Sequence, residues 1–215
     1  MTLSVDLYVS YRSPYSFFMA AQLRPLAESQ DLRVVVCPVL PLILRYPNAL
    51  ADQNPALGRY FLIDVARTAA FLGLPYTGAP DPDPVATDES GLRPADEQPV
   101  IHRVTRLGLA AEKRGGGLRF YEEYGRLLWS GEAWAEGDRL AHAAAVAGLD
   151  FGALETDILE RGDAFAAEID ENGRALEASG HWGTPTCVFR GEPFFGQDRY
   201  EQLVWRFEQN GLVQR

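Results

Sequence analysis

Two strand-like segments flank one helix-like segment in the first forty residues, and this order most constrains the fold. Residues 3–11, "LSVDLYVSY", alternate apolar side chains and are rich in β-branched and aromatic types, which predicts a strand. Residues 32–40, "LRVVVCPVL", form a continuous apolar run typical of a buried parallel strand. Apolar residues at helical spacing over 16–29 predict a helix between them, which Pro25 can kink or end early. The chain therefore begins with a β-α-β unit.

The rest of the chain separates into a helical middle and a mixed end. Residues 56–74 predict a helix that stops at Gly73, and residues 76–99 are rich in Pro, Asp and Gly, as in an ordered excursion or a flexible loop. Three or four helices follow up to residue 159, and one more covers 161–179. Residues 184–196 predict a hairpin around an Arg-Gly turn, followed by a last amphipathic helix.

This order, β-α-β, then helices, then β-β-α, predicts an α/β protein. It is the order of a thioredoxin-like fold with a helical domain inserted between the two halves. We expect the thioredoxin-like domain over residues 1–45 and 178–215, and the inserted helical domain over residues 46–177.

Composition limits the partners. Of the 215 residues, 47% are apolar and 23% are charged, with a formal net charge of −10. An acidic chain repels phosphate backbones, so we expect no nucleic-acid partner. No segment reaches the roughly 20 apolar residues of a membrane span, and the first residues lack the features of a signal peptide. We therefore expect a cytoplasmic protein that does not enter a membrane.

The two cysteines, Cys37 and Cys187, form neither a disulfide framework nor a zinc-binding spacing, and no metal site is expected. In a thioredoxin-like sheet their strands flank the first strand, about 9.6 Å apart. A disulfide needs Cα atoms within about 7 Å, so both thiols should be free.

The turn after the first strand reads Ser13-Pro14-Tyr15-Ser16 and carries two hydroxyl groups. It lies at the carboxyl end of the strand, where open α/β sheets bind ligands. Two interpretations stay open: either serine caps the helix, or a hydroxyl at the positive helix end donates to the thiolate of a bound ligand. Redox relatives carry Cys-x-x-Cys here. Because both sulfurs are absent, this turn cannot exchange disulfides itself.

Two later motifs contain further candidate residues. In "GTPT", residues 183–186, context favours a cis Thr184-Pro185 bond over the commoner trans form. The Thr184 backbone would then face the serine turn and pair with a peptide-like ligand, as an added strand does. In "FFGQDR", residues 194–199, Gln197 and Asp198 begin the last helix. Asp198 either stabilises that helix end or binds a ligand ammonium group.

Together with the weaker "YFLIDVAR" of residues 60–67, these motifs make the chain resemble the 2-hydroxychromene-2-carboxylate isomerase family. That family is related to kappa-class glutathione transferases and to DsbA-type oxidoreductases. The resemblance implies that glutathione is bound, with Ser13 holding its sulfur and the Thr184 backbone pairing with its cysteinyl unit. Gln197 and Asp198 fall on the pair that holds the γ-glutamyl end, and Asn48 falls on an asparagine that also contacts glutathione.

The resemblance is incomplete elsewhere. The family's lysine contact has no counterpart, and the nearest basic residue is Arg59. Residues 76–99, in the region that shapes the family's second-substrate pocket, differ from its usual pattern. For that pocket we name Arg12, Tyr15, Arg59, His181 and Trp182. Arg12 adds positive charge beside Ser13 if it points inward, and its alternative is a solvated side chain. The alternative for His181 is a plain surface or structural role.

Three functions remain open from the sequence. The first is a glutathione-dependent isomerase that acts on an unsaturated, aromatic-derived carboxylate by reversible thiolate addition. The second is a glutathione transferase or peroxidase, and the third is a module that binds a thiol or peptide without turnover. We expect a small-molecule substrate and a homodimer.

Overall fold

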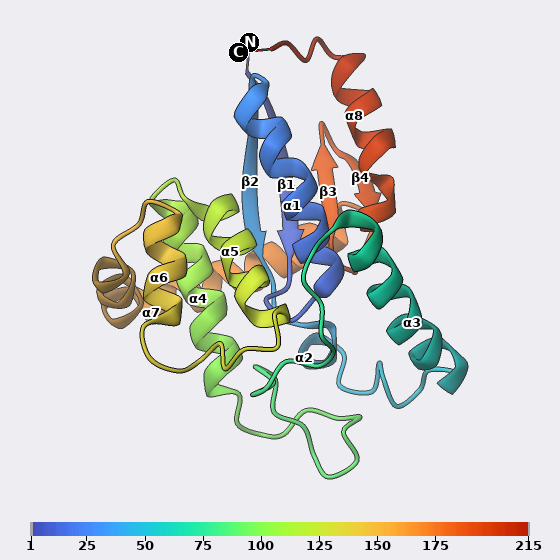
Figure 1. The fold of residues 1–215 in the computed structure, drawn as a ribbon, viewed down its shortest axis with the longest axis vertical. Coiled ribbons are helices and arrows are strands. Elements are labelled where there is room, and N and C mark those ends of the chain that lie inside the picture. Colours follow the sequence, from blue (N-terminus) through green and yellow to red (C-terminus); the bar gives the residue numbers. More distant parts are fainter. Residues whose placement is uncertain (1, 215) are drawn as a thin grey trace.

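The computed structural model describes residues 2–214, in which four strands form one mixed sheet of order β2-β1-β3-β4 (Figure 1). The central strand β1 pairs in parallel with β2, from Leu3 opposite Leu32 to Val9 opposite Pro38, and antiparallel with β3. This confirms the predicted α/β fold and its β-α-β opening. The strands are β1 (Leu3–Val9), β2 (Leu32–Pro38), β3 (Thr186–Phe189) and β4 (Glu192–Phe195).

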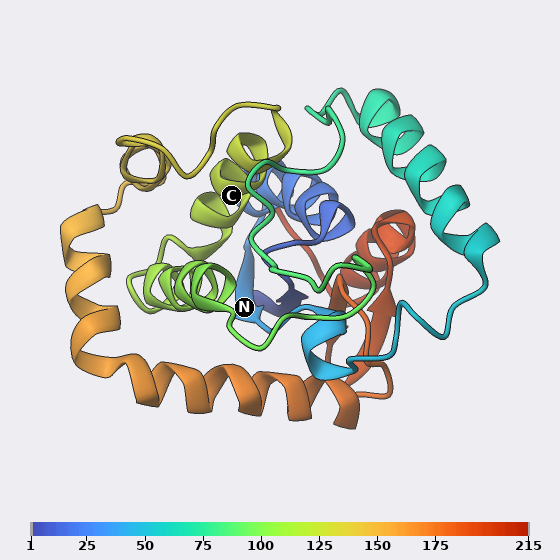
Figure 2. The same cartoon turned by 90° about the horizontal axis from the view of Figure 1, so that it is seen from below.

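Helix α1 (Pro14–Ser29) covers one face of the sheet, and the end of α7 covers the other (Figures 1 and 2). Proline at the first position suits a helix start because its fixed φ is helical and its missing N–H would be unpaired there. The helix continues through Pro25 to its predicted end, so this proline does not stop it. Its buried residues are Pro14, Ser16, Phe17, Phe18, Met19, Ala20 and Leu23.

The middle of the chain is helical, as predicted. Gly73 ends α3 in the left-handed conformation, at φ 66°. The two helices expected at the end of the block are one bent helix, α7, with non-helical backbone at Arg161. The helices are α2 (Leu42–Arg45), α3 (Pro55–Leu72), α4 (Pro99–Lys113), α5 (Gly117–Trp129), α6 (Arg139–Val146) and α7 (Phe151–Ala178). The predicted domain boundaries stay a prediction.

The C-terminal part forms the predicted hairpin and helix. Arg190 and Gly191 join β3 to β4 with φ of 52° and 81°, the positive values that a tight two-residue hairpin turn requires. The 3₁₀ turn η1 (Gln197–Arg199) then leads into α8 (Tyr200–Glu208). Leu203 and Phe207 of α8 are fully buried.

Two tyrosines of α5 attach the helical block to the end of β1. The Tyr121 hydroxyl donates to the carbonyl of Ser10 at 2.7 Å, and the Tyr124 hydroxyl donates to the carbonyl of Tyr11 at 2.9 Å. Gly108 of α4 lies against Tyr11, and a Cβ there would come within 1.7 Å of the tyrosine oxygen. Helices α4 and α5 therefore set the position of the turn that follows β1.

Residues 76–99 form an ordered excursion, which decides between the two predicted alternatives. Trp134 donates from its indole nitrogen to the Pro82 carbonyl at 2.6 Å. Gln98 accepts from the Ala86 backbone at 3.0 Å and donates to its carbonyl at 2.7 Å. Val85 is buried between these anchors.

Cys37 and Cys187 are both unbonded, as predicted. They lie on β2 and β3, the two neighbours of β1. Burial raises the pKa of Cys37 to about 12, and burial also raises the pKa of Cys187. Neither thiol ionises appreciably at neutral pH, so neither is an activated nucleophile.

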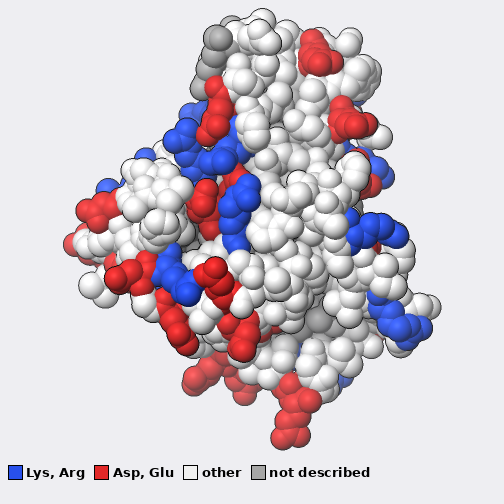
Figure 3. Space-filling model, in the orientation of Figure 1, with Lys and Arg blue, Asp and Glu red and all other residues white. Residues whose placement is uncertain are grey.

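Charged side chains of both signs are interspersed over the helical block on the face shown in Figure 3, and much of the rest of that face is uncharged. Across residues 2–214, no helix combines the length and apolar character needed to cross a membrane. Within the same range, no three His, Cys, Asp or Glu side chains gather as a metal site would require.

We predict that Tyr124→Phe lowers the free energy of unfolding by about 1–3 kcal/mol, because it leaves the Tyr11 carbonyl without this donor. Tyr11→Phe is the matched control, since the buried Tyr11 hydroxyl has no hydrogen-bond partner within residues 2–214. This control should be neutral or stabilising. Urea unfolding of both variants measures the difference. Equal losses of unfolding free energy in the two variants would show that the Tyr124 hydrogen bond does not contribute to stability.

Candidate functional site

Ser13 caps α1 and also lines a cleft. Its Oγ accepts from the Ser16 backbone N–H at 3.2 Å, and its own N–H donates to the Ser10 carbonyl at 3.0 Å. The cap interpretation is therefore correct for Ser13. Capping uses only an oxygen lone pair, so the hydroxyl hydrogen remains available to another acceptor. A cap and a donor to a ligand are compatible in this one side chain.

Ser16, the other hydroxyl of the turn, faces the core. It is fully buried, and its oxygen makes no hydrogen bond of good geometry within residues 2–214, although the Tyr121 hydroxyl lies close. The two serines therefore differ, and only Ser13 can meet a ligand from the cleft.

The cleft has a volume of about 440 Å³ and lies at the carboxyl end of β1. It brings Ser13 together with Thr184, from the opposite end of the chain. The Thr184-Pro185 bond is cis, as predicted, and Pro185 is buried beneath it. Of the predicted residues, those that line the cleft are Arg12, Ser13, Tyr15, His181, Trp182 and Thr184. Other lining residues include Ser10, Leu42, Phe61, Gly183 and Phe195.

Arg12 does not supply a free positive charge, which corrects one sequence-based expectation. Its guanidinium donates to both carboxylate oxygens of Asp83, at 2.8 and 2.6 Å. The pair neutralises the charge beside Ser13 and ties the excursion to the turn. Residues 76–99 reach the site through this pair but do not line the cleft themselves.

Tyr15 joins the turn to α3 through Asp64, a contact that the sequence analysis did not identify. Its hydroxyl donates to Asp64 at 2.6 Å, and Asp64 also accepts from Arg67 at 2.5 Å and from Tyr60 at 3.2 Å. The bond from Tyr15 is the main cause of a lowered Asp64 pKa, whereas burial and then this bond raise the pKa of Tyr15. Spacings of three and four within "YFLIDVAR" place the three α3 residues on one helix face.

An aromatic stack forms the other wall of the cleft. The His181 ring lies between Trp182 and Phe195, with centroid distances of 4.6 and 3.8 Å. His181 Nδ1 accepts from the Gly183 backbone N–H at 2.9 Å. Partial burial lowers the pKa of His181, so the ring is neutral at neutral pH.

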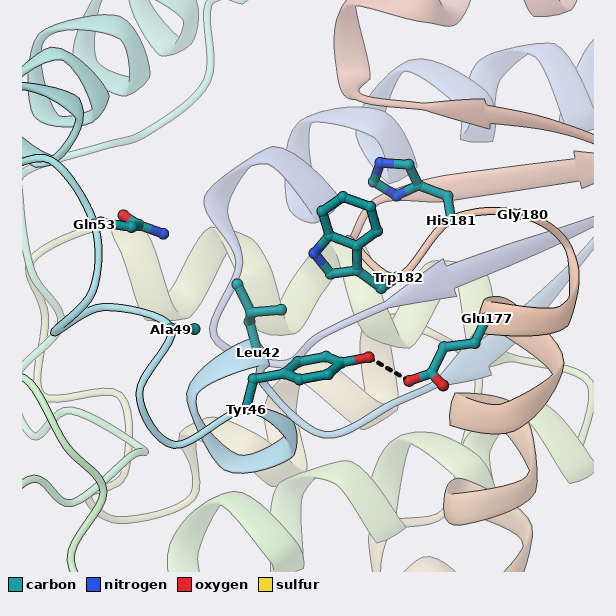
Figure 4. Close-up of a pocket in the computed structure, with 8 residues that line it drawn as sticks. All are labelled: Leu42, Tyr46, Ala49, Gln53, Glu177, Gly180, His181 and Trp182. Atoms are coloured by element: carbon teal, nitrogen blue, oxygen red, sulfur yellow. Dashed lines mark hydrogen bonds between the residues drawn. The ribbon is translucent and has the colours of Figure 1, made fainter.

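A second cavity of about 590 Å³ adjoins the cleft and shares Leu42, His181 and Trp182 with it (Figure 4). In Figure 4 Tyr46 and Leu42 face Trp182 from the opposite side of this space. The Tyr46 hydroxyl donates to Glu177 at 2.5 Å. The remaining lining residues are Ala49, Gln53 and Gly180.

Arg45 holds the loop that carries the aromatic stack. It donates from Nη2 to the Trp182 carbonyl at 2.6 Å and from Nε to the Leu40 carbonyl at 2.9 Å. Arg45 and Glu177 were not predicted, because their partners lie more than 130 residues away. No local pattern in the sequence signals such contacts.

Besides the buried Pro185, four predicted residues are not among the residues that line the two cavities. Asn48 is exposed in the turn after α2, and Arg59 is exposed on α3. Gln197 accepts from Gln22 at 3.4 Å, and Asp198 pairs with its neighbour Arg199 at 2.8 Å. Their roles toward glutathione stay predictions.

The sequence matches the family model described as DSBA-like thioredoxin domain over residues 4–208, nearly the whole chain. The chain belongs to this family. A comparison with curated protein sequences gave no significant match. The turn at Ser13 and Ser16 carries no thiol, so this member of the family lacks a dithiol at the start of α1.

Solved structures show the same fold. A 2-hydroxychromene-2-carboxylate isomerase is 20% identical with a TM-score of 0.65, covering 96% of this chain and 95% of its own. A probable DsbA oxidoreductase from Streptomyces coelicolor has the same identity and TM-score, at coverages of 96% and 89%. The cytosolic disulfide reductase DsbM from Pseudomonas aeruginosa, solved with GSH, is 18% identical with a TM-score of 0.60, at coverages of 96% and 100%.

We predict that Tyr15→Phe lowers the free energy of unfolding at pH 5–7. This loss of stability should shrink as the pH falls below 3.8, the ordinary pKa of an Asp side chain such as that of Asp64. A depressed carboxyl pKa contributes stability above its unfolded value and loses it as the pH falls through the folded value. Urea unfolding from pH 7 to pH 2.5 measures the difference. A loss that does not change with pH would show that Tyr15 acts through packing instead of through Asp64.

Proposed function

We propose that this protein is a glutathione-dependent isomerase of the 2-hydroxychromene-2-carboxylate isomerase type. The observation that carries the proposal is that one cleft contains both the Ser13 hydroxyl and the backbone of Thr184. Ser13 stands at the start of α1, with Thr184 across the cleft and no cysteine in the turn. Such a site cannot form a disulfide of its own, but it suits a thiol that the ligand supplies. DsbM, which shares this fold, was solved with GSH.

Glutathione is proposed to lie with its sulfur at the Ser13 hydroxyl and its cysteinyl backbone along Thr184. Gln197 and Asp198 would hold the γ-glutamyl end, and Asn48 would contact the rest of the molecule. The binding of an extended peptide backbone by an exposed backbone segment follows the principle of strand addition.

The thiolate is stabilised by two groups of α1. The positive end of this 16-residue helix favours a negative charge. The Ser13 hydroxyl hydrogen, which capping leaves free, donates to the sulfur. Because Asp83 neutralises Arg12, these two groups carry the effect without help from the neighbouring arginine.

The proposed reaction begins when the thiolate adds to an electron-poor carbon of an unsaturated, aromatic-derived carboxylate. A C–S bond forms, and the electron pair of the double bond moves into the conjugated carbonyl. The former double bond then rotates, or a ring opens. Return of the electron pair breaks the C–S bond and releases glutathione unchanged.

A glutathione transferase or peroxidase is the alternative enzyme, and a thiol-binding module without turnover is the alternative of another class. A panel of aromatic-degradation intermediates and general electrophiles, assayed with and without glutathione, separates them. We expect turnover that requires glutathione and leaves its concentration unchanged. Consumption of glutathione would favour the transferase or peroxidase. Binding without turnover would favour the module.

We predict that Ser13→Ala raises the pKa of the bound glutathione thiol by about one to two units. A hydrogen bond to a charged group contributes about 1.5–3 kcal/mol, and each pKa unit corresponds to about 1.4 kcal/mol. The loss of the cap should also lower stability by about 0.5–2 kcal/mol. Thiolate absorbance, titrated against pH in the complex, measures the first effect.

Ser16→Ala is the matched control, because the buried Ser16 hydroxyl faces the core. It should leave the bound thiol pKa unchanged. If Ser13→Ala loses stability without shifting that pKa, Ser13 is only a cap and the catalytic assignment is wrong.

We also propose a cytoplasmic homodimer. Apolar side chains exposed on α3 support a second copy as partner, since large exposed apolar patches mark interaction surfaces. Sedimentation equilibrium should give the dimer mass, and a monomer at micromolar concentration would contradict this. The exposed residues are Leu57, Tyr60, Phe61, Leu62, Ile63 and Phe71.

A further inference from the structure

The His181 ring has a fixed orientation. Its two faces and its Nδ1 are occupied, so only the ring edge with Nε2 can contact a ligand. Trp182 and Phe195 cover its two ring faces, at centroid distances of 4.6 and 3.8 Å. The Gly183 N–H occupies Nδ1 at 2.9 Å. In the neutral ring an accepting Nδ1 places the proton on Nε2, so the free edge presents an N–H donor.

The stack depends on a glycine at position 183. A Cβ there would lie 2.5 Å from the Phe195 ring and 2.9 Å from the His181 ring. Only glycine lets the loop approach both rings this closely. The histidine is therefore held by the backbone of its own loop as well as by its two aromatic neighbours.

His181 also lies where the two cavities meet. It lines the cleft with Ser13 and the adjoining cavity with Tyr46. Glu177, which lines the adjoining cavity, accepts from Tyr46, and Arg45 donates to the Trp182 carbonyl. A neutral donor thus belongs to a residue that lines both the cleft with Ser13 and the adjoining cavity.

We propose that the Nε2–H of His181 donates a hydrogen bond to the carbonyl oxygen of the second substrate, with a flat ring lying in the cavity between Trp182 and Tyr46. This inference rests on the proposed function. As the thiolate adds, the displaced electron pair collects on that oxygen as an enolate, and the histidine stabilises it without giving up its proton. Reversal returns the pair and breaks the C–S bond. The step thus needs no further reactant.

Two substitutions separate donation to a ligand from a role within the loop. In His181→Asn the side-chain oxygen can replace Nδ1 as the acceptor for Gly183, but no donor remains at the Nε2 position. In His181→Gln the amide nitrogen can replace Nε2 as donor, but the Gly183 acceptor is lost. A purely structural histidine is rescued by Asn, and a donating histidine is rescued by Gln.

The probe is 4-phenylbut-3-en-2-one, an enone that reports the addition step alone, because its absorbance falls while the glutathione adduct persists. We expect His181→Asn to lower kcat by about 100-fold, in the range found when one donor to a developing oxyanion is removed. His181→Gln should stay within about tenfold of wild type on the same basis. Glutathione affinity should change little in His181→Asn, whereas loss of the aromatic stack should lower the melting temperature of His181→Asn and His181→Gln alike. Wild-type rates in His181→Asn, or a loss only in His181→Gln, would overturn the inference.

A binding measurement gives a readout that does not depend on turnover. The chain has three histidines, so the side-chain ¹⁵N–H signal of His181 is identified by its loss in His181→Asn. The saturated ketone 4-phenylbutan-2-one should move that proton signal downfield in wild type. No shift at saturating ketone would contradict the contact. If wild type neither binds glutathione nor reacts while this shift is present, the proposed function fails and the donor contact does not.

Discussion

The position of the turn between β1 and α1 is the constraint on which the rest of the site depends. Tyr121 and Tyr124 reach from α5 and bind the carbonyls of Ser10 and Tyr11, the two residues that lead into the turn. Helix α5 thus fixes the turn that carries Ser13. From the other side Arg12 is tied to the excursion through Asp83. A donor held from both sides needs little rearrangement to meet a charged ligand, which is the arrangement that favours catalysis.

The opposite wall of the cleft is stabilised by different contacts, mainly aromatic stacking. The loop of residues 180–184 contains no helix or strand. It is stabilised by stacking of His181 on Trp182 and Phe195. Arg45 adds a hydrogen bond from α2 to the Trp182 carbonyl. The result is two fixed walls with different chemistry: a hydroxyl at a helix end faces an aromatic stack with one polar edge. The proposed thiolate addition to a flat unsaturated molecule would use both walls.

Local patterns were sufficient to predict most of the fold. Alternation gave β1, a continuous apolar run gave β2, and the Arg190-Gly191 pair gave the hairpin, because each of these depends on neighbouring residues. Ser13 was predicted as a site residue from the turn that it occupies. The pairing of Arg12 with Asp83 could not be predicted, since it joins residues 71 positions apart. The same reason explains why Arg45, Glu177 and the Tyr15–Asp64 bond were missed. The division of α7 into two helices has a local cause, because its backbone is non-helical at Arg161.

The central claim is that glutathione binds in the cleft with its sulfur at Ser13. Amide NMR spectra of the ¹⁵N-labelled protein, recorded during titration with reduced glutathione, test it most directly. The account predicts saturable shifts at the amides of Ser13 and Ser16, at the start of α1, and at Thr184 across the cleft, with S-methylglutathione giving smaller shifts at the serine turn. No saturable shift at these amides, or shifts confined to residues outside the cleft, would contradict it.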